Sequence, residues 1–154
     1  MSVGQYWAGD WHAALDRTAE LLADTASVRM PLRAVWHTVT GRIQWARGGL
    51  ADAQRHADLA IAAAGRRQDP QELGPALVFA ARIACESNDP ARAADLVREL
   101  LDLLDLLAGS ILLPDVGFDL PLVMSRLGRR ESSLDGVPAS PWSDAARAFP
   151  KSVE

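Results

Sequence analysis

The sequence predicts an all-α protein built from stacked antiparallel helix hairpins. Ala and Leu dominate its apolar residues and Tyr occurs only once, a composition that favours helix over sheet. Helix stop and start signals recur every 39 or 40 residues, and the segments between them contain few helix breakers. The 154 residues, 49% of them hydrophobic, suit one globular domain with a sizeable core.

Three aligned segments carry the repeat: "GDWHAAL" at 9–15, "GGLADAQ" at 48–54 and "NDPARAA" at 88–94. Each opens with Gly or Asn, the residues that tolerate the left-handed conformation ending a helix. Asp10 and Asp89 follow in two of them and suit the N-cap of the next helix. Five residues past each stop lies a small residue that lets paired helices approach closely: Ala14, Ala53 and Ala93.

The first elements follow in order from these signals. Residues 1–8 are predicted to be the last turns of a helix, and 10–25 its partner. Further helices are expected at 30–47 and 50–67, with Pro31 tolerated in a first turn.

The third hairpin is predicted from residue 69 to residue 107. "DPQE" at 69–72 has the arrangement of a capping box, with Asp69 as N-cap and Glu72 three residues on. The helix that it opens runs to about 87, and the next covers 90–107. That last helix is amphipathic, and its predicted core stripe is Leu96, Leu100, Leu103 and Leu107.

After residue 107 the repeat degrades. The segment "GSILLPDVGFDLP" at 109–121 holds two Gly and two Pro, so a helix is expected to begin late, near Asp119, and to stop at Gly128. The units are therefore 1–27, 28–67, 68–107 and 108–134. Residues 135–154 are predicted to be a loop and a short helix capped by Ser140, a candidate cap for the stack.

The Gly-Asp-aromatic-x-x-Ala-Leu run at 9–15, with Gly41 and Ala81 inside the preceding helices, resembles the tetratricopeptide repeat over about residues 5–134. The resemblance implies a right-handed superhelical solenoid of about three and a half units. The chain departs from that family in its longer period, since the family's is near 34 residues, and in the family's usual proline after the second helix, which is absent or displaced here. Long units of this kind are similar to helical-repeat regions of large bacterial signal-transduction ATPases, LuxR-type activators and nucleotide cyclases. The chain resembles a slice of a longer solenoid.

Charge and targeting features narrow the function. A net charge of −4 without a basic stripe argues against nucleic-acid binding. No signal peptide or membrane-length apolar run is present, and a single cysteine, Cys85, fits a reducing compartment. The sequence therefore predicts a cytoplasmic protein.

Candidate sites for chemistry are few. His12, His37 and His56 lie in different predicted helices and form no ligand pair, and His12–Asp16 and Asp52–His56 are interpreted as solvent-facing pairs. No phosphate loop or nucleophile elbow occurs, and Cys85 is interpreted as a small buried residue. We therefore expect no enzyme activity, cofactor or metal.

The first helices of the units are expected to line a concave groove, as the resemblance implies. Positions three and six residues before each stop place Trp45 beside Tyr6 and Arg42 beside Arg82. Arginine grips carboxylates and tryptophan supplies contact area, so the predicted ligand is an acidic or carboxylate-bearing peptide. The alternative is that the arginines pair with Glu86 or nearby acids. The predicted partner-binding set is Tyr6, Thr38, Arg42, Trp45, Val78, Arg82 and Cys85.

Two functions remain open at this stage. The first is a regulatory scaffold that binds a protein or peptide, and the alternative is a small-molecule-sensing domain of a transcriptional or cyclase regulator. An interrupted solenoid exposes apolar end faces, with Trp7 and Leu15 at the front and Leu122 and Trp142 at the back. A homodimer through one terminal face is therefore expected.

Overall fold

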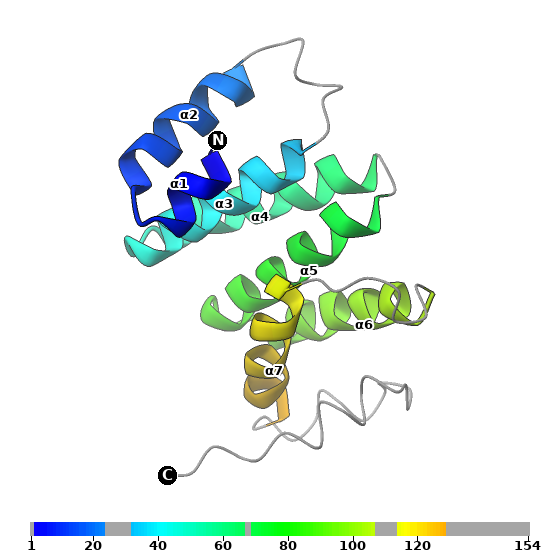
Figure 1. Cartoon of the computed structure of the whole chain (residues 1–154). Coiled ribbons are helices and arrows are strands. Elements are labelled where there is room, and N and C mark those ends of the chain that lie inside the picture. The colour runs from blue at the N-terminus through cyan, green and yellow to red at the C-terminus, as the bar shows by residue number, and fades with distance from the viewer. Residues whose placement is uncertain (1, 24–31, 67–68, 107–113, 129–154) are drawn as a thin grey trace. The chain divides into compact units, whose positions relative to one another are not determined.

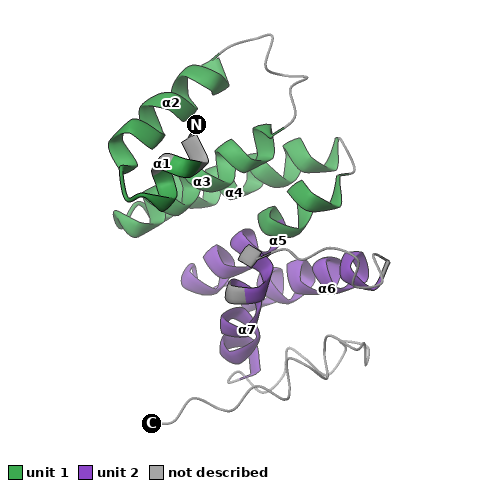
Figure 2. Ribbon diagram, in the orientation of Figure 1, with its two compact units in different colours: residues 1–76 green, residues 77–154 purple. Residues whose placement is uncertain are grey.

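The computed structural model describes residues 2–23, 32–66, 69–106 and 114–128, all in helices or the turns that join them (Figure 1). None of these residues lies in a strand, so the all-α prediction is confirmed for the described part of the chain. The chain divides into two compact units, residues 1–76 and 77–154 (Figure 2). Each unit is described by itself below.

The described residues form seven helices, in the predicted order. Their bounds are α1 Ser2–Trp7, α2 Trp11–Ala23, α3 Arg33–Ala46, α4 Leu50–Gly65, α5 Pro70–Glu86, α6 Pro90–Leu106 and α7 Pro114–Gly128. Helix α7 begins earlier than the sequence predicted, at Pro114 rather than near Asp119. Proline suits a first helical turn because its missing N–H would have no partner there, and Pro121 then falls inside the helix. The predicted helix start at Met30 and the predicted helix after Ser140 lie outside the described residues.

The turns between helices confirm the predicted stop signals. Gly9, Gly48 and Asn88 have φ angles of 80°, 84° and 61°, the left-handed region in which Gly and Asn are favoured. Two turns close with the same bond, since Gly49 N donates to the Gln44 carbonyl at 2.8 Å and Asp89 N to the Ala84 carbonyl at 2.9 Å. This is the Schellman arrangement that satisfies the last carbonyls of a helix.

The predicted N-caps are also present. The Asp10 carboxylate accepts from Ala13 N at 3.2 Å, and the Asp89 carboxylate accepts from Arg92 N at 3.1 Å. In both turns a Gly or Asn ends one helix, and the Asp that follows it caps the next helix.

The capping box predicted at 69–72 is wrong in its second half. Asp69 accepts from Gln71 N at 2.9 Å, but the Glu72 carboxylate accepts from Leu32 N at 2.7 Å instead of turning back on its own helix. Leu32 has a left-handed φ of 77° at the start of α3, where no side chain of α3 itself caps the helix. Glu72, 5% exposed, supplies an acceptor to that helix end from 40 residues away.

Several residues at equivalent positions of the 40-residue repeat are buried to the same extent. The alanines five residues past each stop, Ala14, Ala53 and Ala93, are all fully buried. Five residues before the later stops, Ile43, Ile83 and Val123 are at most 1% exposed. The sequence alignment thus corresponds to equivalent packing positions, as close helix pairing requires.

In the first unit, α1 contacts α2 and α3, α2 contacts α3, and α3 contacts α4 (Figure 1). One core cluster joins Ala14 of α2 to Val39 and Ile43 of α3, with Tyr6 packed against it. A second cluster joins Ala34 of α3 to the end of α4 through Ala63 and Ala64. The Thr40 hydroxyl donates to the Thr18 hydroxyl at 3.1 Å, so the two buried threonines are paired across α2 and α3.

In the second unit, buried residues include Leu77, Ile83, Val97, Leu100 and Val123. Of the predicted stripe on α6, Leu100 is buried, Leu96 and Leu103 are half-buried, and Leu107 lies outside the described residues; the buried face also includes Val97, Leu101 and Leu104. A helix buries a face that is wider than one row of side chains. The row of leucines predicted from the sequence therefore lies along one edge of the buried face of α6.

Candidate functional site

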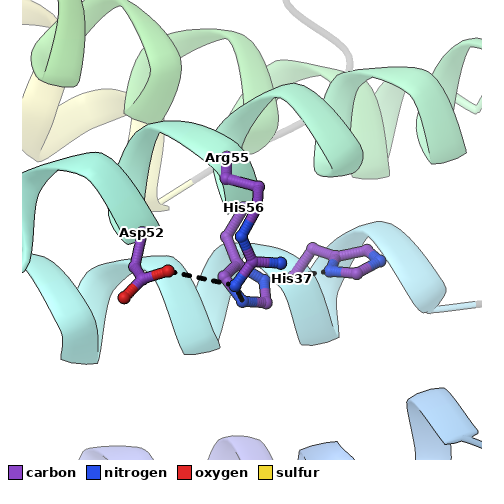
Figure 3. A network of polar contacts seen from close by, with 4 residues as sticks. All are labelled: His37, Asp52, Arg55 and His56. Atoms are coloured by element: carbon purple, nitrogen blue, oxygen red, sulfur yellow. Dashed lines mark hydrogen bonds and ion pairs between the residues drawn. The ribbon is translucent and has the colours of Figure 1, made fainter.

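Two buried histidines face each other across the α3–α4 hairpin (Figure 3). His37 of α3 and His56 of α4 are 6% and 8% exposed, and their Nδ1 atoms lie 3.1 Å apart. The interpretation of His56 as a solvent-facing partner of Asp52 is therefore wrong. His56 lies on the face of α4 that also buries Ala53, Ala57 and Ala60, the helical spacing of a packed stripe.

The hydrogen-bond partners determine the proton positions. Arg55 Nη2 lies 3.2 Å from His56 Nε2, and because arginine only donates, that Nε2 must accept. His56 then carries its proton on Nδ1 and donates it to Nδ1 of His37. His37 in turn carries its own proton on Nε2. Arg55 donates to the Asp52 carboxylate at 3.2 Å as well as to His56, so donation runs outward from Arg55, to Asp52 on one side and through His56 to His37 on the other (Figure 3).

The surroundings keep both imidazoles neutral. Burial, then the neighbouring His56 and the charges of Arg33, Arg55 and Arg66, lower the pKa of His37 to about 4. Burial and the adjacent Arg55 lower the pKa of His56, while Asp52 acts weakly in the opposite direction.

The donor set does not suit a metal ion. Among the described residues no group of three or more His, Cys, Asp or Glu side chains converges on one point. At the histidine pair itself, the Arg55 hydrogen bond places a proton between the two Nδ1 atoms, where a metal would need two lone pairs.

The residues predicted to bind a partner fall into two groups. Thr38 and Val78 are buried in their own units, at 4% and 0% exposed, and offer no exposed side chain. The Thr38 hydroxyl donates to the Ala34 carbonyl at 3.0 Å. The others are half-buried and retain some surface: Tyr6, Arg42, Trp45, Arg82 and Cys85. Cys85 is thus less buried than the sequence suggested.

Arg82 is engaged within the second unit. Its guanidinium lies 3.0 Å from the Asp119 carboxylate of α7, with the two side chains 18% and 9% exposed. A second ion pair joins Arg126 of α7 to Glu86 of α5. Pairing with acids, the alternative weighed for this arginine, is therefore present, although the partner is Asp119 and not Glu86.

The most exposed large apolar side chain among the described residues is that of Trp7, at 67%. Its ring meets Tyr6 edge-on, with centroids 5.2 Å apart and planes at 67°. Trp11, on the other side of the turn, is 37% exposed. The first unit thus carries an aromatic surface at the α1–α2 turn.

Sequence reasoning missed the histidine pair, although a signal for it existed. His37 lies eleven residues before the Gly48 stop and His56 eight residues after it. In an antiparallel hairpin, residues at similar distances from the turn face each other, so the two histidines were candidates for contact.

None of the helices in the described residues combines the length and apolarity needed to cross a membrane. A search among family models, curated proteins and solved structures finds no match to this chain.

Proposed function

We propose that this chain is a non-enzymatic helical-repeat module, similar to tetratricopeptide repeats, that binds a protein or peptide as part of a regulatory assembly. Support comes from the recurring left-handed turns and from the buried alanines at equivalent positions. Repeat modules of this kind bind partners on extended helix surfaces.

The observation that carries the proposal is the exposure of Trp7. Two residues before the stop, the repeat places Trp7, Ala46, Glu86 and Arg126, and three of these are exposed and the fourth half-buried. This position is a surface position of the repeat and not a core position. A tryptophan that is 67% exposed adds little to packing within the hairpin, whereas buried aromatic anchors dominate binding energy at interfaces.

Arg42 and Trp45 extend this surface in the proposal. Both lie on α3, which α1 contacts, and both keep part of their surface exposed. Tyr6 and Trp7 on α1, with Arg42 and Trp45 on α3, would give a peptide apolar area and one site for a carboxylate. The ligand class that fits this combination is an acidic segment with an apolar anchor.

A displayed library of random peptides, selected on the intact chain, tests the proposal. Selected peptides should be rich in Asp, Glu and large apolar residues, and W7A and W45A should each weaken their binding about tenfold or more. L122A is the matched control, because Leu122 is also half exposed, at 50%, but lies on α7. Peptides that bind W7A, W45A and L122A equally well would place the binding surface elsewhere and reject this assignment.

A further inference from the structure

The repeat leaves one position of α1 without the side chain that the other helices bury there. Five residues before their stops, α3, α5 and α7 have Ile43, Ile83 and Val123, which are at most 1% exposed. Five residues before the first stop, Gly9, the chain has Gly4, which is exposed. Apart from the backbone of α1 and the two neighbours of Gly4 in the chain, no atom of the described residues lies within 4 Å of the place that a Cβ would occupy. The space that an aliphatic side chain fills in the other three helices is therefore open at α1.

The contacts of Ile43 show how this position is covered elsewhere in the first unit. Ile43 of α3 lies in one core cluster with Ala14 of α2, and Tyr6 of α1 packs against that cluster. Helices α1 and α2 both contact α3 (Figure 1). The position thus pairs a large side chain on α3 with a small one on the helix packed against it. At Gly4 the small residue is on α1, so a helix packed there in the same way has to supply the large side chain to reach ordinary packing density.

The surroundings of Gly4 are apolar. Gly4 and Trp7 are three residues apart on α1 and are therefore neighbours on one side of that helix. The Trp7 side chain is 67% exposed, and its ring meets Tyr6 edge-on. An aliphatic side chain placed over Gly4 would also cover part of the Trp7 ring, so that both would lose contact with water.

We infer that the apolar anchor of the bound peptide is an aliphatic side chain of the size of Val or Ile that fills the space over Gly4, and that the peptide binds there as a helix. The size follows from the three β-branched residues at the equivalent position, and the helical conformation from the packing of α2 on α3. A helix that lays its apolar face on a protein surface is a common mode of peptide recognition. This inference rests on the proposed function, because it names the anchor and the conformation of the same ligand.

The test fills the space from within the chain. G4I gives α1 the side chain that α3 and α5 have at the equivalent position, so it should weaken binding of peptides selected on the wild-type chain about tenfold or more. Helicity and melting temperature should be kept, because a helix favours isoleucine over glycine and the side chain has room. G117I is the matched control, since Gly117 is an exposed glycine of α7 with the same free space around its Cβ position.

A matching change in the peptide makes the assignment specific. Replacing the essential aliphatic residue of a selected peptide by alanine should weaken its binding to the wild-type chain about tenfold, and should have little further effect on its binding to G4I. Fluorescence anisotropy of the labelled peptide measures all four combinations. The intact chain is used at a concentration at which light scattering shows a monomer, so that self-association does not compete with the peptide.

The outcomes separate this inference from the proposed function. If W7A and W45A weaken binding while G4I binds like the wild type, the peptide surface stands and the anchor over Gly4 is overturned. Equal losses in G4I and G117I overturn it as well. Peptides that bind W7A, W45A and L122A equally well reject the peptide surface and the inference together. If no peptide is selected but G4I abolishes self-association of the chain, the occupant is a second copy and the inference is wrong.

Discussion

The second and third hairpins use one repeat pattern for different purposes. Eleven residues before the stop and eight after it, the α3–α4 hairpin has His37 and His56, while α5 and α6 have Leu77 and Leu96. Leu77 is fully buried and Leu96 half-buried, so the fold accepts apolar side chains at both positions. A buried polar pair is therefore not a requirement of the repeat.

The two hairpins also differ in the size of their buried side chains. At four equivalent positions α4 buries Ala53, Ala57, Ala60 and Ala64, where α6 buries Ala93, Val97, Leu100 and Leu104. Small residues let α4 approach α3 closely, and a close approach is what allows two imidazoles to meet at 3.1 Å. The alanine face and the histidine pair are thus parts of one local arrangement.

The largest expected effect belongs to the second unit, where a largely buried ion pair joins α5 to α7. D119A removes the carboxylate beside Arg82 and leaves a mostly buried guanidinium without this partner, which should cost about 3 kcal/mol of unfolding free energy. The matched control is D95A, which removes an exposed i,i+3 pair with Arg98 and should cost less than about 0.5 kcal/mol. Denaturant unfolding monitored by circular dichroism measures both. Equal losses would mean that the Arg82–Asp119 pair is no more important than a surface pair.

The second prediction is acid sensitivity confined to the first unit. The pKa of His37 is about 4 in the folded chain, below its ordinary value of 6.5. Above pH 6.5 the imidazole is therefore neutral in both the folded and the unfolded chain, and protonation takes nothing from the free energy of unfolding. As the pH falls from 6.5 to 4 the unfolded chain takes up the proton first, and up to about 3 kcal/mol of stability is lost. Hydrogen exchange read by mass spectrometry should show peptides of α3 and α4 losing protection in this range.

The double variant H37L/H56L sharpens this prediction, because it places leucine where the α5–α6 hairpin has Leu77 and Leu96. Replacing both polar partners with apolar ones should change stability at pH 7 by less than about 1.5 kcal/mol and remove the acid sensitivity of α3 and α4. If the double variant loses protection between pH 6.5 and 4 as the wild type does, other groups cause the acid effect.

Much of the fold could be predicted because its signals are local. Gly48 and Asn88 end helices through backbone conformations available to few residues, and Asp10 and Asp89 cap through their own side chains. The capping box failed because Glu72 found a partner 40 residues away, which no local pattern contains.

The candidate site was less predictable for the same reason. The contact between His37 and His56 depends on which faces of α3 and α4 meet, and helical periodicity alone does not determine that. Arg82 was predicted to bind a partner, with pairing to Glu86 or nearby acids as the alternative, and its actual partner, Asp119, lies in a segment where the repeat pattern degrades. Helix bounds thus follow from local chemistry, whereas side-chain partners follow from tertiary packing.

The third prediction concerns the alanine face of α4. A60L introduces the side chain that α6 has at the equivalent position, Leu100, into the buried alanine face of α4, and overpacking there should cost about 2 kcal/mol. A62L is the control, since Ala62 lies on the exposed face of the same helix and should be close to neutral. Thermal unfolding of the two variants decides it. A neutral A60L would show that α4 has room for leucine and that the two hairpins are packed alike.

The smallest effect on stability is expected at Trp7, whose substitution should change self-association and not the packing of the chain. At the equivalent surface position of the second unit, Glu86 pairs with Arg126, whereas Trp7 remains 67% exposed. Burying one such side chain contributes about 1.5–3 kcal/mol, and a two-fold dimer buries it twice through the same patch. We therefore expect a weak homodimer through the α1–α2 end, abolished by W7E with little change in melting temperature. L122E, at the other exposed apolar position, is the control and should still dimerise. Light scattering across a dilution series measures the equilibrium, and a wild-type chain that stays monomeric at its highest concentration would leave Trp7 available to a different protein or peptide.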